Sequence, residues 1–178
     1  MMNRRDFLLF AASAAVATAL PLPAQAQQLP RTLWIARDNP QDGVLLDIST
    51  GKGIAYLQYL LRDVRANRQG LVHPQIVSNL AWVQAWLAHW GLKAPIVATS
   101  GLRTEVTNRE VGGAHQSQHL PDNNGVFRAV DFWVPGANSE DVARMLEWAR
   151  TGGVGFYRSS KHIHLDAGRP RSWGLARN

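Results

Sequence analysis

The chain has 178 residues and contains no cysteine. Neither a disulfide bond nor a thiolate metal ligand is therefore available, so any bound metal must be held by histidine, aspartate or glutamate. Acidic residues are also scarce: 13 Asp and Glu against 19 Lys and Arg give a formal net charge of +6 at pH 7. This balance suits an anionic partner such as a cell-wall polymer, a membrane surface or a nucleic acid, and ordinary solubility explains it about as well.

The N-terminus has the three parts of a secretory signal. Arg4 and Arg5 precede an apolar run from Phe7 to Leu20, and Ala24-Gln25-Ala26 provides a small-x-small cleavage site. The run is shorter than the roughly 20 apolar residues of a membrane span, and "NRRDFLL" is similar to a twin-arginine export signal. We expect residues 1–26 to be a cleaved signal peptide, with an uncleaved anchor as the alternative. The working part would then act in the periplasm, with no membrane span after cleavage.

Residues 27–178 have the length of one ordinary domain with its own core, and they contain no internal repeat. The three tryptophans Trp82, Trp86 and Trp90 fall at helical spacing, which favours core packing over an aromatic binding platform. Helices are predicted early in the chain and strands cluster late, so the fold class is α+β. The expected strands are 32–36, 43–48, 94–100, 127–134, 154–158 and 162–166, and the expected helices are 54–66, 74–90 and 140–151, the last capped by Ser139.

The segment "SSKHIHLDAG" places two imidazoles and a carboxylate at alternate positions. Four of the six histidines fall between 115 and 164. Because alternate side chains of a strand share a face, His162, His164 and Asp166 should line one surface, while Ile163 and Leu165 face a core. An isolated His-x-His is most often a hydrogen-bonded surface pair. The preceding 154–158 strand and this one are predicted to form a closing hairpin.

A second group of polar residues changes that interpretation. "GGAHQSQHLPDNNGVFRAVDF" supplies His119 and, on the next predicted strand, Asp131. Two imidazoles and one carboxylate leave an open position on a tetrahedral ion, as a hydrolytic zinc site requires.

Several stretches together resemble a known family. "SGLRTEVTNREVGGAHQSQH", then "AVDFWVPG", then "GGVGFYRSSKHIHLDAGRPRSW" are similar to the D-Ala-D-Ala-carboxypeptidase-like zinc peptidases of the LAS type, in the MepK/YcbK-like branch of exported murein endopeptidases. The resemblance covers residues 31–174. It implies a hedgehog/D-Ala-D-Ala-peptidase-like single domain, with a small antiparallel sheet and helices packed on it, and an activity on peptide bonds of peptidoglycan.

The resemblance also implies roles for individual residues. His119, Asp131 and His164 would bind Zn²⁺, and His162 would contact the nucleophilic water or the developing oxyanion. Arg103 matches an arginine that stabilises negative charge near the substrate; a structural salt bridge is the equal alternative. Ser117 would position His119. The general base is His162, Asp166, or metal hydroxide assisted by either; we favour His162, with Asp166 orienting or tuning the site.

The chain departs from the family pattern in three places. The family places its aspartate seven residues after the histidine, whereas "PDNNGV" lengthens the His119 to Asp131 interval and makes Asp122 a rival ligand. Phe127 stands where the family has a glycine. Lys161 stands where some relatives carry an acidic general base.

Four other functions remain open. A D,D- or L,D-carboxypeptidase would act on the same substrate, and a non-catalytic peptidoglycan-binding module would use the same fold. A non-haem iron oxygenase would use "HLD" as part of a facial triad, but no histidine follows His164 to complete it. Nucleic-acid binding has only the charge in its favour. We therefore expect peptidoglycan as the partner, no nucleic acid, and a monomer.

Overall fold

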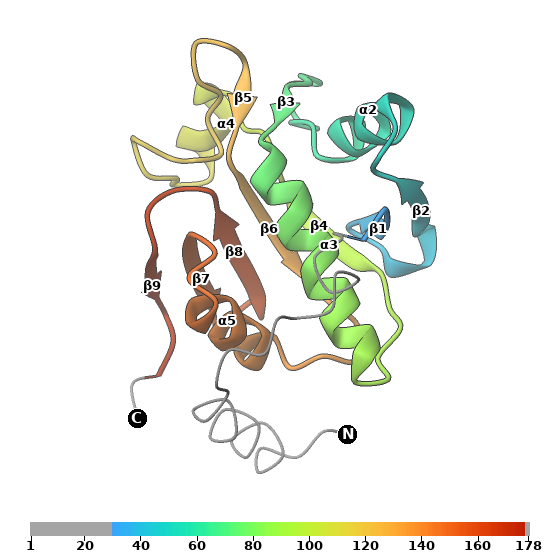
Figure 1. Ribbon diagram of the computed structural model, residues 1–178. Helices are drawn as coiled ribbons and strands as arrows, with labels where there is room; N and C mark the ends of the chain where they lie inside the picture. Colours follow the sequence, from blue (N-terminus) through green and yellow to red (C-terminus); the bar gives the residue numbers. More distant parts are fainter. Residues whose placement is uncertain (1–29, 177–178) are drawn as a thin grey trace.

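The computed structural model describes residues 30–176, so the predicted signal peptide, residues 1–26, lies outside the described residues. The α+β class is confirmed (Figure 1). None of the helices in the described part is long and apolar enough to cross a membrane. The strands are β1 Thr32–Arg37, β2 Val44–Asp47, β3 Leu71–Val72, β4 Ile96–Ser100, β5 Val126–Phe127, β6 Ala129–Trp133, β7 Gly153–Tyr157, β8 His162–Asp166 and β9 Arg171–Trp173. The helices are α2 Gly51–Leu60, α3 Pro74–His89, α4 Glu105–Glu110 and α5 Ser139–Trp148, with a short 3₁₀ turn at Pro40–Asp42.

One seven-stranded sheet carries the fold, in the order β2-β1-β4-β6-β8-β7-β9. The central pairs β4/β6, β6/β8 and β8/β7 are antiparallel, as is β1/β2 at the edge. The pairs β1/β4 and β7/β9 are parallel. The sheet is therefore larger than predicted and mixed rather than wholly antiparallel. A separate two-stranded parallel sheet joins β3 and β5.

The two faces of the central sheet have different characters. Val130, Phe132, Ile163 and Leu165 are buried in a core with the apolar side of the helices, and Figure 1 shows α3 running across that face. Alternation along each strand then places Asp131 and His164 on the opposite face. The period of two in "HIHLD" thus separates the core from the polar site, as predicted.

Helices α2 and α5 differ from their predicted bounds. Helix α2 ends at Leu60 instead of residue 66, because the chain turns after Leu61 and Asp63 pairs with Arg68 in an isolated bridge. Helix α5 is capped by Asn138, whose side chain accepts a hydrogen bond from the Glu140 N–H; Ser139 is its first residue.

The expected strand 127–134 is broken in two at Arg128. The segment before the break, β5, pairs with β3 in the small sheet, and the segment after it, β6, belongs to the large one. The prediction also missed α4, β9 and the short β3. The hairpin of β7 and β8 is confirmed, with Tyr157 opposite His162. Trp82 and Trp86 pack against the core, whereas Trp90 is 40% exposed.

Candidate active site

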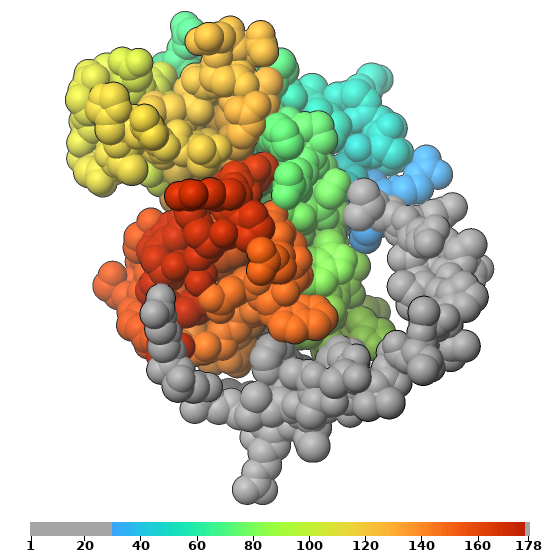
Figure 2. Space-filling model, turned by 60° about the vertical axis from the view of Figure 1, so that its left-hand side comes forward, coloured from blue at the N-terminus to red at the C-terminus, as the bar shows by residue number. Residues whose placement is uncertain are grey.

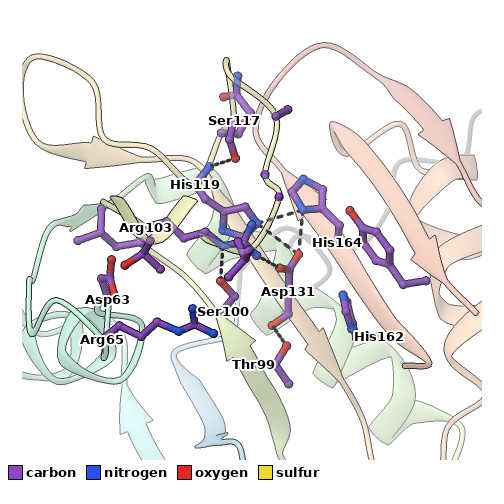
Figure 3. A pocket seen from close by; sticks show the side chains of 18 of the residues that line it. Asp63, Arg65, Thr99, Ser100, Arg103, Ser117, His119, Asp131, His162 and His164 are labelled. Atoms are coloured by element: carbon purple, nitrogen blue, oxygen red, sulfur yellow. Dashed lines mark hydrogen bonds and ion pairs between the residues drawn. The ribbon is translucent and has the colours of Figure 1, made fainter. Parts of the chain in front are cut away.

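Three buried side chains from distant parts of the chain converge on one point of the polar face. Asp131 on β6 and His164 on β8 are paired residues of adjacent strands, and His119 reaches them from the loop that follows α4. Asp131 Oδ1 lies 2.9 Å from His164 Nδ1 and 3.3 Å from His119 Nε2, and the two nitrogens are 3.2 Å apart (Figure 3). The three residues predicted to act together are therefore in contact.

The rival ligand Asp122 lies outside this group. Its carboxylate accepts hydrogen bonds from the N–H groups of Asn124 and Val126 and forms an ion pair with Arg128. The longer interval between His119 and Asp131 is thus taken up by a turn that Asp122 stabilises, and Asp131 keeps its place on β6.

The outer hydrogen bonds of the two imidazoles determine which nitrogens face each other. His119 Nδ1 lies 2.6 Å from the Gly101 carbonyl oxygen, which can only accept a proton. His164 Nε2 lies 3.0 Å from Asp166 Oδ2, a second acceptor. Each ring therefore donates outward, and the lone pairs of His119 Nε2 and His164 Nδ1 point at each other and at Asp131. Three acceptors that converge in this way make a site for a cation.

The spacing of these three atoms fits a tetrahedral metal ion. With bonds of about 2.0–2.1 Å, the ligand atoms of tetrahedral zinc lie about 3.3 Å from one another. The observed separations of 2.9, 3.2 and 3.3 Å are equal to that value or shorter by up to about 0.4 Å. His119, Asp131 and His164 could therefore hold a metal ion with little movement, and a fourth position would remain open on the pocket side.

The pKa shifts have the directions expected of such a centre. Burial alone would raise the pKa of Asp131, but His119 and His164 outweigh it and hold that pKa well below its usual range. Burial lowers the pKa of His119, which keeps its ring neutral. Burial also acts to lower the pKa of His164, yet Asp131 and Asp166 raise it above its usual value. A metal ion bound at His164 Nδ1 would compete with a proton for the same lone pair, so metal binding there should be weaker at acid pH.

Asp166 lies behind His164 and is fully buried. Its carboxylate also accepts hydrogen bonds from both terminal nitrogens of Arg171, at 2.6 and 3.0 Å, and from the Gly168 N–H at 2.8 Å. Burial would raise its pKa, but the hydrogen bonds of His164 and Arg171 outweigh burial and lower it. With its oxygens occupied and no access to the pocket, Asp166 is placed to orient His164, the second of the two roles considered for it.

A tryptophan outside the predicted set covers the other side of His164. The rings of Trp173 and His164 are 5.1 Å apart, and the Arg171 guanidinium lies 5.3 Å from the Trp173 ring. Gly155 on β7 makes room for this indole, because a Cβ at that position would collide with it. Arg171 and Trp173 had no predicted role, although both lie in the stretch "GGVGFYRSSKHIHLDAGRPRSW" that carries the family resemblance.

His162 lies half-buried at the wall of the pocket. Its Nδ1 is 2.7 Å from Ser160 Oγ, and the Tyr157 ring packs against it with 4.6 Å between centroids. Burial and the nearby Arg103 lower its pKa, so the ring is neutral at pH 7. Within residues 30–176 its Nε2 has no hydrogen-bond partner, which leaves that nitrogen available to a molecule in the pocket.

Arg103 and Ser117 complete the predicted set. Arg103 Nη2 is 2.5 Å from Asp131 Oδ2 and its Nε is 2.9 Å from Ser100 Oγ, so the predicted salt bridge is present. The same side chain also lines the pocket, where it can reach a substrate. The Ser117 hydroxyl accepts a hydrogen bond from the His119 N–H at 3.2 Å and so helps to hold the loop that carries this histidine.

The three candidate ligands line one pocket of about 750 Å³ together with His162, Arg103 and Ser117, and this volume lies within the range of small-molecule sites. Its lining comes from the α4 segment on one side and from β7, β8 and β9 on the other. In Figure 2 the α4 segment (yellow) stands as a lobe beside these C-terminal strands (orange to red). The pocket is thus open at the surface and reaches down to the buried centre.

Comparison with known proteins adds an independent line of evidence. The family model for peptidase M15 matches residues 55–166, and the model for twin-arginine translocation signals matches residues 1–21. The chain is 30% identical to the peptidoglycan L,D-endopeptidase MepK of Escherichia coli strain K12, over 96% of this chain and 97% of that protein. It is also 30% identical to the probable peptidoglycan L,D-endopeptidase MepK of Haemophilus influenzae, over 96% of this chain and 95% of that protein.

Proposed function

The chain belongs to the peptidase M15 family, and on this premise we propose that it is an exported zinc-dependent endopeptidase that cleaves L,D-peptide bonds in peptidoglycan. The observation that carries the proposal is the convergence of His119 Nε2, Asp131 Oδ1 and His164 Nδ1 at the bottom of an open pocket. The bond type follows from the names of the relatives, which are L,D-endopeptidases.

In this proposal His119, Asp131 and His164 hold the metal. Two imidazoles and a carboxylate are a typical ligand set of hydrolytic zinc sites, and no thiolate is available to bind a different ion. When bound, zinc supplies Lewis-acid chemistry that polarises the scissile carbonyl and activates water. Gly101 and Asp166 keep the two rings in the orientation that binding requires.

His162 and Arg103 act on the substrate. A neutral His162 with a free Nε2 can take a proton from the attacking water and pass it to the departing amine as the C–N bond breaks. Arg103 presents a guanidinium, which can donate hydrogen bonds to the negative charge that develops on the carbonyl oxygen. Its ion pair with Asp131 places that guanidinium beside the metal ligands.

The compartment and the surface charge agree with this substrate. The twin-arginine signal directs the protein out of the cytoplasm, and we place the mature protein in the periplasm, where peptidoglycan lies. Removal of residues 1–26 takes away Arg4, Arg5 and Asp6, so the net charge of +6 becomes 17 − 12 = +5, which suits an anionic polymer.

The test is to purify the mature protein, measure its bound metal, and identify by mass spectrometry the fragments released from cross-linked muropeptides. Chelation should abolish cleavage and zinc should restore it. His162→Ala should keep the metal and lose about 10²–10⁴-fold in rate. A rate that survives both His164→Ala and complete metal removal would overturn the proposal.

The same spectra distinguish the alternatives. A carboxypeptidase would release single terminal residues and leave cross-links intact. A binding module would sediment with sacculi and release no fragment. The longer interval between His119 and Asp131 would favour a binding module if it kept the two residues apart, but their side chains lie 3.3 Å from each other.

A further inference from the structure

Arginine is over-represented in the pocket, and three of its four arginines are already engaged. Arg37 donates to the carbonyls of Leu60 and Arg62, at 2.9 and 3.3 Å. Arg103 pairs with Asp131, and Arg171 binds Asp166 with two nitrogens. Each of these guanidinium groups holds part of the fold or of the metal-binding centre.

Arg65 is different. Within residues 30–176 its guanidinium has a single partner, Glu110, through one contact of 3.2 Å between Nη1 and Oε2. Both side chains are more than half exposed, at 61% and 52%. An exposed pair with one contact contributes only about 0–1 kcal/mol, so most of the hydrogen-bonding capacity of Arg65 is available to a ligand.

The backbone that carries Arg65 is nevertheless held firmly. Asp63 accepts hydrogen bonds from the N–H and hydroxyl of Thr104, at 2.8 and 3.0 Å, and from the Ala66 N–H at 3.1 Å. These bonds tie the Arg65 turn to the residue that follows Arg103. In Figure 3 the Arg65 side chain points toward Ser100, and both residues line the pocket. Its charge is therefore presented to the same space as the catalytic groups.

Two exposed apolar side chains line the same pocket as this arginine. Val64 and Val111 line the same part of the pocket and are 49% and 43% exposed. A pocket that combines a guanidinium with exposed valine side chains suits a ligand group that combines methylenes with a terminal carboxylate.

We propose that Arg65 is a specificity-determining residue that binds a free carboxylate of the stem peptide, with Glu110 as a competing carboxylate that occupies it in the unliganded protein. This inference rests on the proposed function. Diaminopimelate in the cross-link has the required chemistry, because it carries a free carboxylate at the end of a methylene chain. Amidation of that carboxylate would remove the charge and one of the two acceptor oxygens that a guanidinium can bind.

The experiment compares two forms of one cross-linked muropeptide dimer, with the diaminopimelate carboxyl free or amidated, as substrates of the metal-loaded protein. The wild type should show a KM up to about fivefold lower for the free acid, the size expected for one solvent-exposed ion pair. Arg65→Gln should raise that KM to the value of the amidated form and leave kcat unchanged. Glu110→Gln should lower the KM of the free acid a few-fold, because the competitor is gone.

Arg109→Gln is the matched control. Arg109 lies on the same helix as Glu110, is 69% exposed, pairs with Glu105 at 3.9 Å, and is absent from the pocket lining. Its substitution should leave both KM values unchanged. Equal KM values for the two wild-type substrates, or an unchanged KM in Arg65→Gln, would overturn the inference about Arg65 while leaving the proposed function in place.

A wild-type protein that cleaves neither form would instead contradict the proposed function. Arg65 would then be judged from dissociation constants of the metal-loaded protein with the same two muropeptides. A preference for the free acid that disappears in Arg65→Gln would support the carboxylate site, and its absence would reject the site.

Discussion

Asp166 Oδ2 lies 3.0 Å from His164 Nε2, on the side of the ring opposite to the metal-binding centre. This contact directs one ring proton outward, so His164 faces Asp131 with the lone pair of Nδ1. His164 therefore depends on Asp166 for its tautomer as well as its orientation. Arg171 in turn fixes Asp166 through two hydrogen bonds.

Asp166→Asn is expected to weaken zinc binding about 10–100-fold, because an amide accepts the His164 proton less strongly than a carboxylate. The measurement is competition with a chromophoric chelator. Glu105→Gln, whose side chain is 83% exposed on α4, removes one negative charge elsewhere and should leave the affinity unchanged. Equal zinc affinities for Asp166→Asn and wild type would show that the carboxylate does not tune the ligand.

Arg103→Gln tests whether this arginine acts on the substrate or only on Asp131. Arg103 could have both roles. It bonds to Asp131 Oδ2 and leaves Oδ1 to face the histidines, and its side chain also lines the pocket. We expect kcat to fall about 10²–10³-fold, as for loss of an oxyanion donor. Zinc affinity should change far less, because all three ligand atoms remain.

The control for Arg103→Gln is Arg128→Gln, which breaks the ion pair with Asp122 outside the pocket. Its kcat should match that of the wild type. A kcat that stays high in Arg103→Gln while zinc is lost would assign Arg103 to the support of Asp131 alone.

Gly155→Ala tests the packing of Trp173 against His164. A Cβ at this position would meet the indole, and the ring would have to leave its place beside His164. We expect the free energy of unfolding to fall by about 1–3 kcal/mol, as in other overpacked sites. Gly51→Ala is the matched change, because a Cβ added at Gly51 would have no neighbouring atom within 4 Å. Its effect on the unfolding free energy, measured by urea denaturation, should be neutral or slightly stabilising. Equal stability of the two variants would mean that the indole moves freely.

The proximity of Asp131 and His164 could be predicted from the sequence for a local reason. In "HIHLD" and "RAVDF" the apolar and polar residues alternate, and this alternation alone places Asp131 and His164 on the polar face of neighbouring strands. His119 needed the family resemblance, because a loop residue has no periodicity that indicates its direction. The same resemblance favoured Asp131 over Asp122 as a ligand. The physical reason is that the Asp122 carboxylate is engaged by the backbone of the turn at residues 122–126.

The features that the sequence did not predict depend on contacts between distant segments. Strand β9 has three exposed residues and forms only by parallel pairing with β7. Helix α4 has six residues and buries only Thr107 and Asn108, so it lacks an apolar stripe. Leu61 and Val64 continued the helical spacing of α2, but the hydrogen bonds of Asp63 to Thr104 end the helix earlier. Arg65 reaches the pocket as a result of that same turn.

Asp63 gives a prediction for the pH dependence of stability. It is 3% exposed. Burial alone would raise its pKa, but hydrogen bonds from Thr104, Thr107 and Ala66 outweigh burial and lower it. A carboxylate with a lowered pKa in the folded state stabilises the protein above its unfolded pKa of about 3.9, and this contribution is lost as the pH falls through the lower, folded value.

Asp63→Asn should therefore cost about 1–3 kcal/mol of unfolding free energy at pH 7, and its difference from the wild type should shrink below about pH 4. Urea denaturation across this range measures the difference in unfolding free energy. Comparison of the two proteins at each pH cancels effects of metal binding, because Asp63 is not one of the three candidate ligands. Asp42→Asn, at an exposed site, should change stability by less than about 0.5 kcal/mol. If the difference in unfolding free energy between Asp63→Asn and wild type stayed constant down to pH 3, the hydrogen bonds to Asp63 would not favour its charged form. Asp63 joins the turn of Arg65 to the loop of Arg103. Protonation of its carboxylate at acid pH should therefore weaken the hydrogen bonds that hold both arginines in position.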